Sequence, residues 1–188
     1  SGQPVAVIPS IGAALMAKTW ISDIRTWPAP RPEDDGISLL AATLDEVADG
    51  PVGIPSGPET FLRMPQADFA RFQTKTARSL RDDAGITAQL RAVKSDAEIA
   101  KIGHACQIAA RAFARVPEIA APGVPLSQVF RGFQALLLDE GADWVPYLAG
   151  GAGPLGYADV ISPADDTPLA RGDVLMLDTG AVWDGYFC

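Results

Sequence analysis

The residue with the clearest chemical potential is Asp178, which directly follows the apolar run at 174–177. A carboxylate in such a run is expected to lose much of its hydration, which is unfavourable unless another group compensates. An arginine partner, several N–H donors or a cation would compensate. A simpler alternative stays open, in which Asp178 only caps a turn with Thr179 and Gly180.

A β-hairpin signal follows this carboxylate. If Asp184-Gly185 is a two-residue loop, Ala181 lies opposite Cys188, and Gly180 lies opposite the next residue of the chain. Asp178 and Gly180 share a face because side chains alternate with a period of two. The residue after Cys188 would then be the diagonal neighbour of Asp178, roughly 7–8 Å away between backbones. Gly180 would leave space for both side chains to converge on one or two ions, and a divalent cation would remove the repulsion between two acidic groups.

Other candidates are weaker. His104 is the one histidine of the sequence, and we expect it on a helix surface or at the edge of the core. The glycine-rich segment 150–156 is predicted to be a flexible loop, and it lacks the Gly-Lys-Ser/Thr ending of a phosphate-binding loop. Tyr157 follows this loop and is a candidate substrate contact. Trp183 and Tyr186 face each other across the predicted hairpin and are interpreted as packing residues.

The elements that position Asp178 belong to the second half of the chain. Ser95 and Glu98 form a capping-box pattern, which predicts a helix that continues as one apolar stripe to Val116. A second helix is predicted over 126–140. The pattern then changes to strands, with one at 144–148 and another in the run that precedes Asp178.

The first half of the chain is predicted to be a small α/β domain. Its strands are expected at 4–8, 23–27 and 52–54. Its helices are expected from Ser10 to Trp20, over 37–49, and along the stripe from Phe69 to Leu80. A polar connection at 81–95 follows, with one apolar patch. The expected domains are therefore 1–85 and 86–188.

Composition limits the function classes. The chain has 188 residues, with 48% hydrophobic and 20% charged residues, as in a globular protein. Its net charge of −8, without lysine and arginine clusters, argues against nucleic acid and anionic membranes as partners. No apolar run is long enough to span a membrane, and no signal peptide is evident. The two cysteines are expected to be free thiols in a reducing cytosol. Both ends lie within apolar strand patterns, so the chain is expected to be part of a longer protein.

The segment 171–181, followed by Asp184-Gly185-Tyr186, resembles the first metal-binding segment of the pita-bread superfamily. That superfamily includes Xaa-Pro aminopeptidases, prolidases, methionine aminopeptidases and creatinase. The segment 90–95 with Glu98 and Ile99 resembles the start of their catalytic domain. The similarity covers about 85–188, and it is weaker over the first 80 residues. It implies a partial α/β N-terminal domain of the creatinase type and the N-terminal half of an α+β pita-bread catalytic domain.

The resemblance also implies a chemistry. The superfamily uses two Asp, one His and two Glu as metal ligands; Asp178 matches the first Asp, and the others would lie beyond Cys188. It implies two divalent ions, of manganese, cobalt, zinc or iron, bridging a hydroxide that attacks an amide carbon. The expected function is that of a metal-dependent, cytoplasmic and homodimeric hydrolase of the Xaa-Pro peptidase type. It would cleave a C–N bond in a small peptide-like or amide substrate, and this chain alone is expected to be inactive.

One position departs from the superfamily pattern. Its peptidase and creatinase members carry a histidine about 17 or 18 residues before the first Asp, where this sequence has Ile161 or Val160. The departure argues against creatine hydrolysis and leaves two alternatives open. One is a lyase on the same metal scaffold, and the other is a non-catalytic pita-bread binding module.

Overall fold

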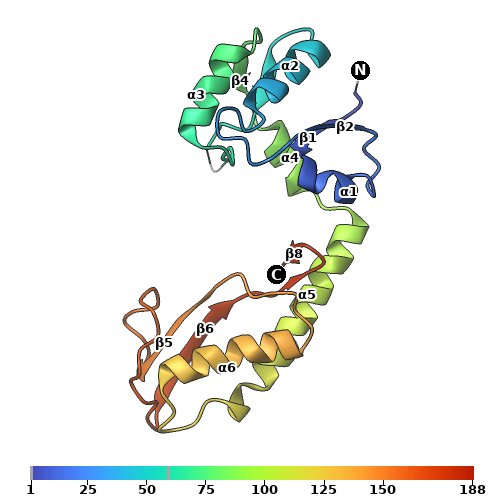
Figure 1. Cartoon of the computed structure of the whole chain (residues 1–188). Coiled ribbons are helices and arrows are strands. Elements are labelled where there is room, and N and C mark those ends of the chain that lie inside the picture. The colour runs from blue at the N-terminus through green and yellow to red at the C-terminus, as the bar shows by residue number, and fades with distance from the viewer. Residues whose placement is uncertain (1, 59) are drawn as a thin grey trace. The chain divides into compact units, whose positions relative to one another are not determined.

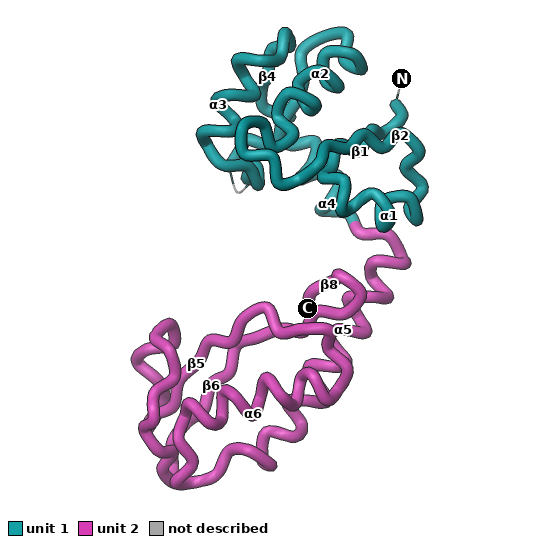
Figure 2. Tube along the Cα trace, in the orientation of Figure 1, with its two compact units in different colours: residues 1–93 teal, residues 94–188 magenta. Residues whose placement is uncertain are grey.

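The structure is a computed structural model that describes residues 2–58 and 60–188. Its contacts divide the chain into two compact units, 1–93 and 94–188 (Figure 2). This division lies after Val93, whereas the sequence placed the domain boundary after residue 85. The reason is a helix, α4 (Ile86–Ala92), which belongs to the first unit. Asp83 starts α4 by accepting the backbone N–H groups of Gly85 and Thr87 at 2.9 and 3.0 Å.

The first unit contains two separate pairs of parallel strands. β1 (Val5–Pro9) pairs with β2 (Asp23–Trp27), and β3 (Val52–Ile54) pairs with β4 (Leu80–Asp82). Helices α2 (Ile37–Val47) and α3 (Gln66–Lys75) pack together, and their buried residues form the core of this unit. That core consists of Ile37, Ala41 and Phe72. The unit therefore has the mixed α/β character predicted from the sequence.

Two helix predictions in the first unit are wrong in extent. The segment predicted as a helix from Ser10 to Trp20 is a short 3₁₀ turn, η1 (Ser10–Gly12), followed by one helical turn, α1 (Ala13–Met16). The stripe that was predicted to run to Leu80 ends at Lys75, and Leu80 begins β4. Asp45 of α2 accepts the Thr76 hydroxyl at 2.6 Å and the Ala77 N–H at 3.0 Å. These bonds capture the chain as it leaves α3, so a contact from a distant helix ends the predicted stripe.

The second unit is built on two helices and four strands. The helices are α5 (Asp96–Ala114) and α6 (Leu126–Asp139), with a 3₁₀ turn, η2 (Val116–Glu118), between them; the strands are β5 (Leu148–Pro154), β6 (Asp173–Thr179), β7 (Val182–Trp183) and β8 (Tyr186–Phe187) (Figure 1). The predicted capping box is confirmed. Ser95 Oγ accepts the Glu98 N–H at 3.3 Å, and Glu98 Oε2 accepts the Ser95 N–H at 2.7 Å.

The core of the second unit lies between the helices and the strands. Ile108 and Ala112 of α5 are fully buried together with Phe133 and Leu137 of α6. Leu148, Leu177 and other apolar residues of the strands pack against this cluster. None of the helices in the described ranges is both long and apolar enough to cross a membrane.

Most of the glycine-rich segment is a strand, so the prediction of a flexible loop over 150–156 is wrong for 150–154, and only 155–156 form a turn. β5 pairs antiparallel with β6, with Ala149 opposite Asp178 and Gly150 opposite Leu177. A Cβ atom on Gly150 would overlap the carbonyl oxygen of Met176 and lie 3.2 Å from the Phe130 ring. The glycine therefore permits a close approach that a larger residue would prevent. In the predicted strand at 144–148, only Leu148 belongs to β5, although Trp144 forms an isolated bridge with Val182.

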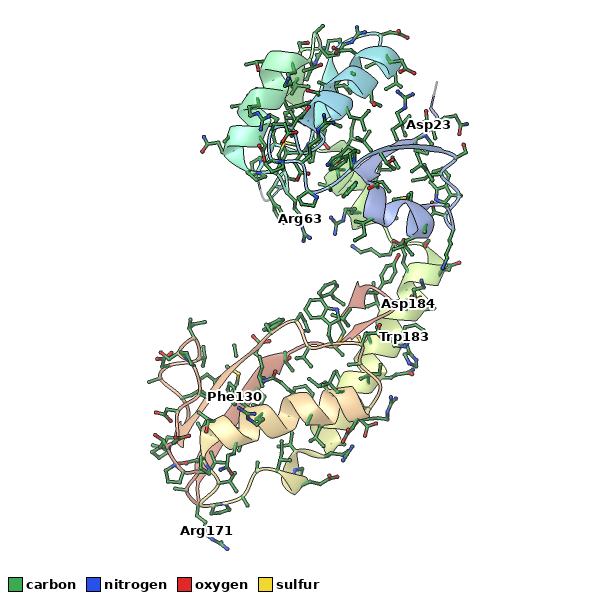
Figure 3. The ribbon with its side chains drawn as sticks, in the orientation of Figure 1. Asp23, Arg63, Phe130, Arg171, Trp183 and Asp184 are labelled. Carbon is green, nitrogen blue, oxygen red and sulfur yellow. The ribbon has the colours of Figure 1, made fainter. Side chains whose placement is uncertain are left out.

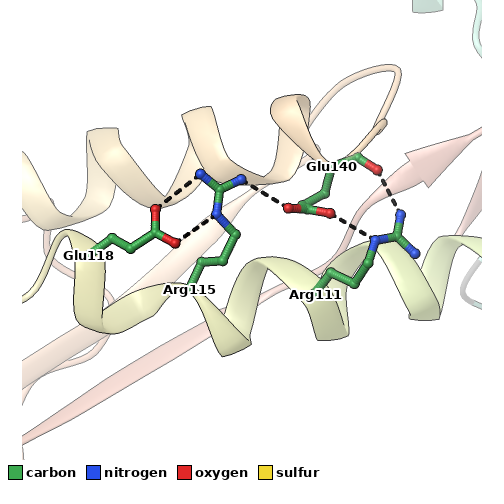
Figure 4. Close-up of polar contacts among 4 residues, drawn as sticks. All are labelled: Arg111, Arg115, Glu118 and Glu140. Atoms are coloured by element: carbon green, nitrogen blue, oxygen red, sulfur yellow. Dashed lines mark hydrogen bonds and ion pairs between the residues drawn. The ribbon is translucent and has the colours of Figure 1, made fainter.

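Arg111 of α5 and Arg115, the residue that caps the C-terminus of α5, join this helix to the end of α6 (Figure 4). Arg111 Nε donates to Glu140 Oε2 at 2.8 Å, and Arg115 Nη1 donates to Glu140 Oε1 at 2.9 Å. Arg115 also forms two bonds of 3.0 Å with Glu118. Both Glu140 oxygens are thus held by guanidinium groups, which fixes the helix pair that supports the strands.

We expect Glu140→Gln to lower the melting temperature by a few degrees near neutral pH. The hydrogen bond from Arg111, followed by that from Arg115, lowers the pKa of Glu140 from its ordinary value of 4.5. A lowered folded pKa stabilises the protein above the ordinary value, and this contribution disappears as pH falls through the folded pKa. The difference between variant and wild type should therefore shrink in acid. Thermal melts across pH would measure it, with Asp139→Asn as control, because Asp139 forms no ion pair within the described ranges. An equal loss at every pH would contradict the ion-pair explanation.

A second prediction concerns the close approach in β5. Gly150→Ala should destabilise the protein by about 1–3 kcal/mol or more, because the added methyl group meets a backbone carbonyl that cannot rotate away. Gly103 of α5 is the matched control, since a Cβ there would have no neighbour within 4 Å. Gly103→Ala should stabilise by about 0.5–1 kcal/mol. Urea unfolding of both variants tests the pair, and two changes of the same sign would refute this account of β5.

Candidate functional site

Asp178 lies near the end of β6 and is exposed. Its neighbour Leu177 packs on the helical core, and the alternation of side chains places Asp178 on the opposite face. The prediction that this carboxylate loses most of its water is therefore wrong for the part of the chain that is described. The apolar run was interpreted as dry on both faces, but Val174 of the same strand is also 45% exposed. Only the face toward the helices is buried.

Tyr147 holds one oxygen of this carboxylate. Its hydroxyl donates to Asp178 Oδ1 at 3.2 Å, and its carbonyl oxygen accepts the Thr179 hydroxyl. The bond to Asp178, with smaller contributions from burial and from the Asp178 charge, raises the pKa of Tyr147 above its ordinary value of 10.0. Among the described residues, Asp178 Oδ2 accepts no hydrogen bond. One carboxylate oxygen is thus oriented while the other stays open to a ligand.

Tyr147 was not recognised as a site residue from the sequence. The β5–β6 register pairs Leu148 with Thr179, so one step further Tyr147 lies opposite Gly180 and diagonal to Asp178. Diagonal neighbours are within reach of an aromatic side chain, and Gly180 has no side chain to interfere. The signal was present, but it required the strand to continue through the glycines that were predicted to be a loop.

The predicted hairpin is confirmed. Trp183 pairs with Tyr186 and Val182 pairs with Phe187, while the loop residues Asp184 and Gly185 have φ of 47° and 78°. Positive φ at both loop positions is typical of the type I′ turn. The register continues to the last residue, because the Cys188 N–H donates to the Ala181 carbonyl oxygen at 3.1 Å.

Gly180 does not leave the open space that was predicted. A Cβ atom on Gly180 would overlap the carbonyl oxygen of Cys188, so backbone occupies that position. A glycine is still required at position 180, because the backbone of Cys188 passes too close for any side chain there. Space for ligands near Asp178 must therefore lie beside this point, where Tyr147 reaches the carboxylate.

The helix α5 holds the hairpin by three side chains spaced three residues apart. Lys101 Nζ forms an ion pair of 2.6 Å with Asp184, and Glu98 accepts the Tyr186 hydroxyl at 3.3 Å. The ring of His104 lies 4.2 Å from that of Trp183. Figure 3 labels Trp183 and its neighbour Asp184 in the hairpin. His104 is half-buried, as expected for a histidine at the edge of the core. Trp183 and Tyr186 both contact α5, which agrees with a packing role.

Tyr157 lies on the same face of the sheet as Asp178. Its Cβ would be 3.3 Å from a Cβ placed on Gly151, and Gly151 shares a face with Ala149, the partner of Asp178. Tyr157 is exposed, and no hydrogen bond joins it to Asp178 within the described ranges. The segment after β5 thus folds over the face that carries the carboxylate, and Val160 of this segment accepts the Gly150 N–H at 3.1 Å.

The sequence and the structure of this chain are both similar to those of known peptidases. The model of metallopeptidase family M24 matches residues 100–188, which include most of α5, all of α6 and the strand β6 that carries Asp178. The whole chain superimposes on an X-Pro aminopeptidase from Thermotoga maritima with a TM-score of 0.78 and 21% identity, and covers 51% of that chain. The second unit thus matches this metallopeptidase family over most of its length, and the whole chain has the fold of the N-terminal half of such pita-bread peptidases.

Two further solved structures are similar to this pita-bread chain over its full length. The dipeptidase PepE from Mycobacterium ulcerans has a TM-score of 0.78 and 26% identity, with 49% of that chain covered. An Xaa-Pro dipeptidase from Bacillus anthracis has a TM-score of 0.81 and 20% identity, with 50% covered. No match was found among curated protein sequences. The chain thus spans about half the length of the structures it matches.

The predicted fold class is confirmed. The chain is the α/β N-terminal creatinase-type domain in part, followed by the N-terminal half of the α+β pita-bread catalytic domain. The pita-bread chain itself supplies one candidate metal ligand. Within the described ranges, no three His, Cys, Asp or Glu side chains gather as a metal site. The open, exposed oxygen of Asp178 is the kind of hard ligand that divalent cations bind, so this residue fits such an ion without completing its site.

The hydrogen bond between Tyr147 and Asp178 can be tested by titration. Asp178→Asn removes the negative charge, so the pKa of Tyr147 should fall back toward 10.0. The tyrosinate ultraviolet absorbance measures this change, and Tyr147→Phe identifies its share among the three tyrosines. Asp173→Asn is the control, because Asp173 lies at the other end of β6. An unchanged Tyr147 titration in Asp178→Asn would show that the two groups do not interact.

Proposed function

We propose that the protein containing this chain is a metal-dependent hydrolase of the Xaa-Pro peptidase type. It cleaves a C–N bond in a small peptide-like or amide substrate. The observation that carries the proposal is the match of metallopeptidase family M24 to the segment that places Asp178 on the open face of β6. The similar structures named as X-Pro aminopeptidase and Xaa-Pro dipeptidase support the same reaction class.

In this proposal Asp178 is a metal ligand. Tyr147 orients the carboxylate through Oδ1 and leaves Oδ2 for the ion. We further propose that the remaining ligands follow Cys188 in the full-length protein and that the site holds two ions of manganese, cobalt, zinc or iron, as the resemblance implies. Divalent ions bound there would polarise the scissile carbonyl group and lower the pKa of bound water. The part of this chain is to hold and orient one ligand and to enclose the face on which it lies.

Tyr157 is proposed as a substrate contact. It lies over Gly151 on the face of Asp178, and its side chain is exposed. An exposed phenol on a segment that borders the site offers both an apolar ring and a hydrogen-bonding tip to a bound peptide. Homodimer formation and a cytoplasmic location complete the proposal, and both rest on the resemblance to the superfamily.

The absence of a histidine at position 160 or 161 limits the reactions that this site could catalyse. Ile161 is 84% exposed, and the Val160 carbonyl oxygen accepts the Gly150 N–H, so this segment has apolar side chains where the resemblance implies an imidazole. His104 does not replace it, because it lies on α5 against Trp183. Proton transfer of the creatinase kind therefore has no group at this position, which argues against creatine as substrate.

This same departure favours a lyase as the second candidate function. A metal-bound pocket without the histidine could support proton abstraction and elimination instead of hydrolysis. The products distinguish the two, because elimination creates a double bond and adds no water oxygen. Mass spectrometry of a reaction in ¹⁸O-labelled water decides: label in the product supports hydrolysis, and an unlabelled product with a new double bond supports the lyase.

Metal content is the direct test of the proposed ligand. The purified full-length protein should contain a bound transition metal, and Asp178→Ala should lower its metal content and abolish cleavage of an Xaa-Pro dipeptide. Loss of one carboxylate ligand removes both a charge and a coordinating atom. Even the loss of a residue that only contacts a ligand lowers metal affinity by roughly 10-fold or more, so Asp178→Ala should lower it by at least that factor. Elemental analysis after dialysis gives the metal content.

Asp173→Asn is the matched control, because it neutralises a carboxylate of the same strand, at the end far from Asp178. It should leave the metal content unchanged. Full metal loading of Asp178→Ala would exclude Asp178 as a ligand. A metal-free wild-type protein that binds another protein would instead favour the non-catalytic binding module.

A further inference from the structure

The two cysteines of the sequence are brought together by the fold of the second unit. Cys106 lies on α5 and Cys188 follows β8, 82 residues later (188 − 106). Both are free and exposed. The contact between α5 and β8 is what makes these distant positions neighbours.

Strand pairing determines the direction of Cys188. Its N–H donates to the carbonyl of Ala181 at 3.1 Å, so the two residues lie opposite each other. Opposite residues in an antiparallel pair point to the same face. Ala181 is fully buried against the α5 residues Ile108 and Ala109. The side chain of Cys188 is therefore directed toward α5.

Helix geometry brings Cys106 to the same place. Cys106 precedes Ala109 by three residues, and such positions are neighbours on one side of a helix. The backbone N–H of Ala181 donates to Cys188 Sγ at 3.1 Å, which fixes the orientation of that thiol. Burial raises the pKa of Cys106, and the charge of Cys188 and a hydrogen bond to its thiol raise it further. The two cysteines thus lie on the same side of the interface between α5 and the hairpin.

The hairpin is held in this position by contacts on both sides of the thiols. Lys101 binds Asp184, and the ring of His104 packs on Trp183. The thiols consequently approach each other as parts of a fixed interface and not as ends of mobile segments. Such preorganisation increases the rate of an intramolecular reaction over the competing intermolecular one.

We propose that Cys106 and Cys188 are a redox-active pair that low-molecular-weight disulfides, such as oxidised glutathione, convert into an intramolecular disulfide. One thiolate, that of Cys188, attacks the glutathione disulfide, forms a mixed disulfide and releases one glutathione thiolate. Cys106 then attacks the sulfur of Cys188 and releases the second. Two protein thiols are oxidised, one glutathione disulfide is reduced to two thiols, and the reaction reverses in an excess of reduced glutathione.

Burial makes Cys106 a weaker acid than a free cysteine, which suits it to the second, resolving step. The product ties the end of β8 to α5 and closes a loop of the intervening chain. Such a link should slow the separation of the hairpin from the helix. This proposal does not depend on the metal site, because its reaction uses only the two cysteines and the added disulfide.

The experiment exposes the full-length protein to oxidised glutathione, quenches it with an alkylating reagent and measures intact mass and non-reduced peptide maps. The peptides of the wild type that contain Cys106 and Cys188 should be recovered as one linked pair, about 2 Da lighter than the two free peptides together and without glutathione on either cysteine. Dithiothreitol should restore the original mass. Wild type that carries glutathione without an internal link, links two molecules, or does not react would overturn the proposal.

Single variants provide the matched controls. Cys106→Ser should retain one glutathione on Cys188, because the resolving thiol is absent, and Cys106→Ala serves the same purpose should the hydroxyl disturb folding. Lys101→Met loosens the hairpin without touching either thiol, and it should slow formation of the internal disulfide several-fold. Rapid loss of glutathione from Cys106→Ser would contradict the resolving role of Cys106. An unchanged rate of disulfide formation in Lys101→Met would contradict the preorganised interface.

Discussion

The alternation of side chains along β6 is the constraint on which the candidate site depends. Leu177 packs against the cluster formed by Ile108 and Phe133, and this contact fixes which face of the strand is turned to the helices. Asp178 then has to lie on the other face. A slip of one residue in the β5–β6 register would bury the carboxylate in the apolar core, at a cost that pairing with β5 could not offset. The position of the candidate ligand is therefore a consequence of apolar packing on the opposite side of the sheet.

This origin changes the reason for assigning a metal to Asp178. A dehydrated carboxylate would have required a compensating charge, but the exposed Asp178 keeps its water and requires none. The assignment rests instead on three features that agree: the family match, the open Oδ2, and the bond from Tyr147 that orients Oδ1. An exposed carboxylate costs the fold little when no cation is present, whereas a buried one would be strongly destabilising without a partner.

Local patterns in the sequence predicted the elements that local interactions determine. The capping box at Ser95 needs only the first turn of its helix, and the Asp184-Gly185 loop needs only its own dihedral angles, so both were predicted correctly. The two longest helices follow from their apolar stripes for the same reason. These elements are sufficient to place Asp178 on a strand beside a hairpin.

The wrong predictions share a cause, which is contact between segments distant in sequence. The glycines of β5 resemble a flexible loop unless Met176 and Phe130 are known to lie against Gly150. In the sequence, the apolar stripe of α3 continues to Leu80 in β4. The helix nevertheless ends at Lys75, where Asp45 of α2 binds the next residue, Thr76. Exposure of Asp178 is likewise a property of one face of a strand, and an apolar run alone does not specify which faces are covered. Tyr147 was missed because its role depends on that same register.

One ribbon connects the two sites of the second unit. From Asp178 the chain passes through Gly180, whose position lies directly under the Cys188 carbonyl, to Ala181, which packs on α5 opposite Cys188. With no side chain between them, the Gly180 backbone and the Cys188 carbonyl are in close contact. Whatever fixes Cys188 against α5 therefore also restricts the backbone two residues from Asp178. The helical face of the hairpin and the carboxylate on the opposite face therefore share one short stretch of backbone.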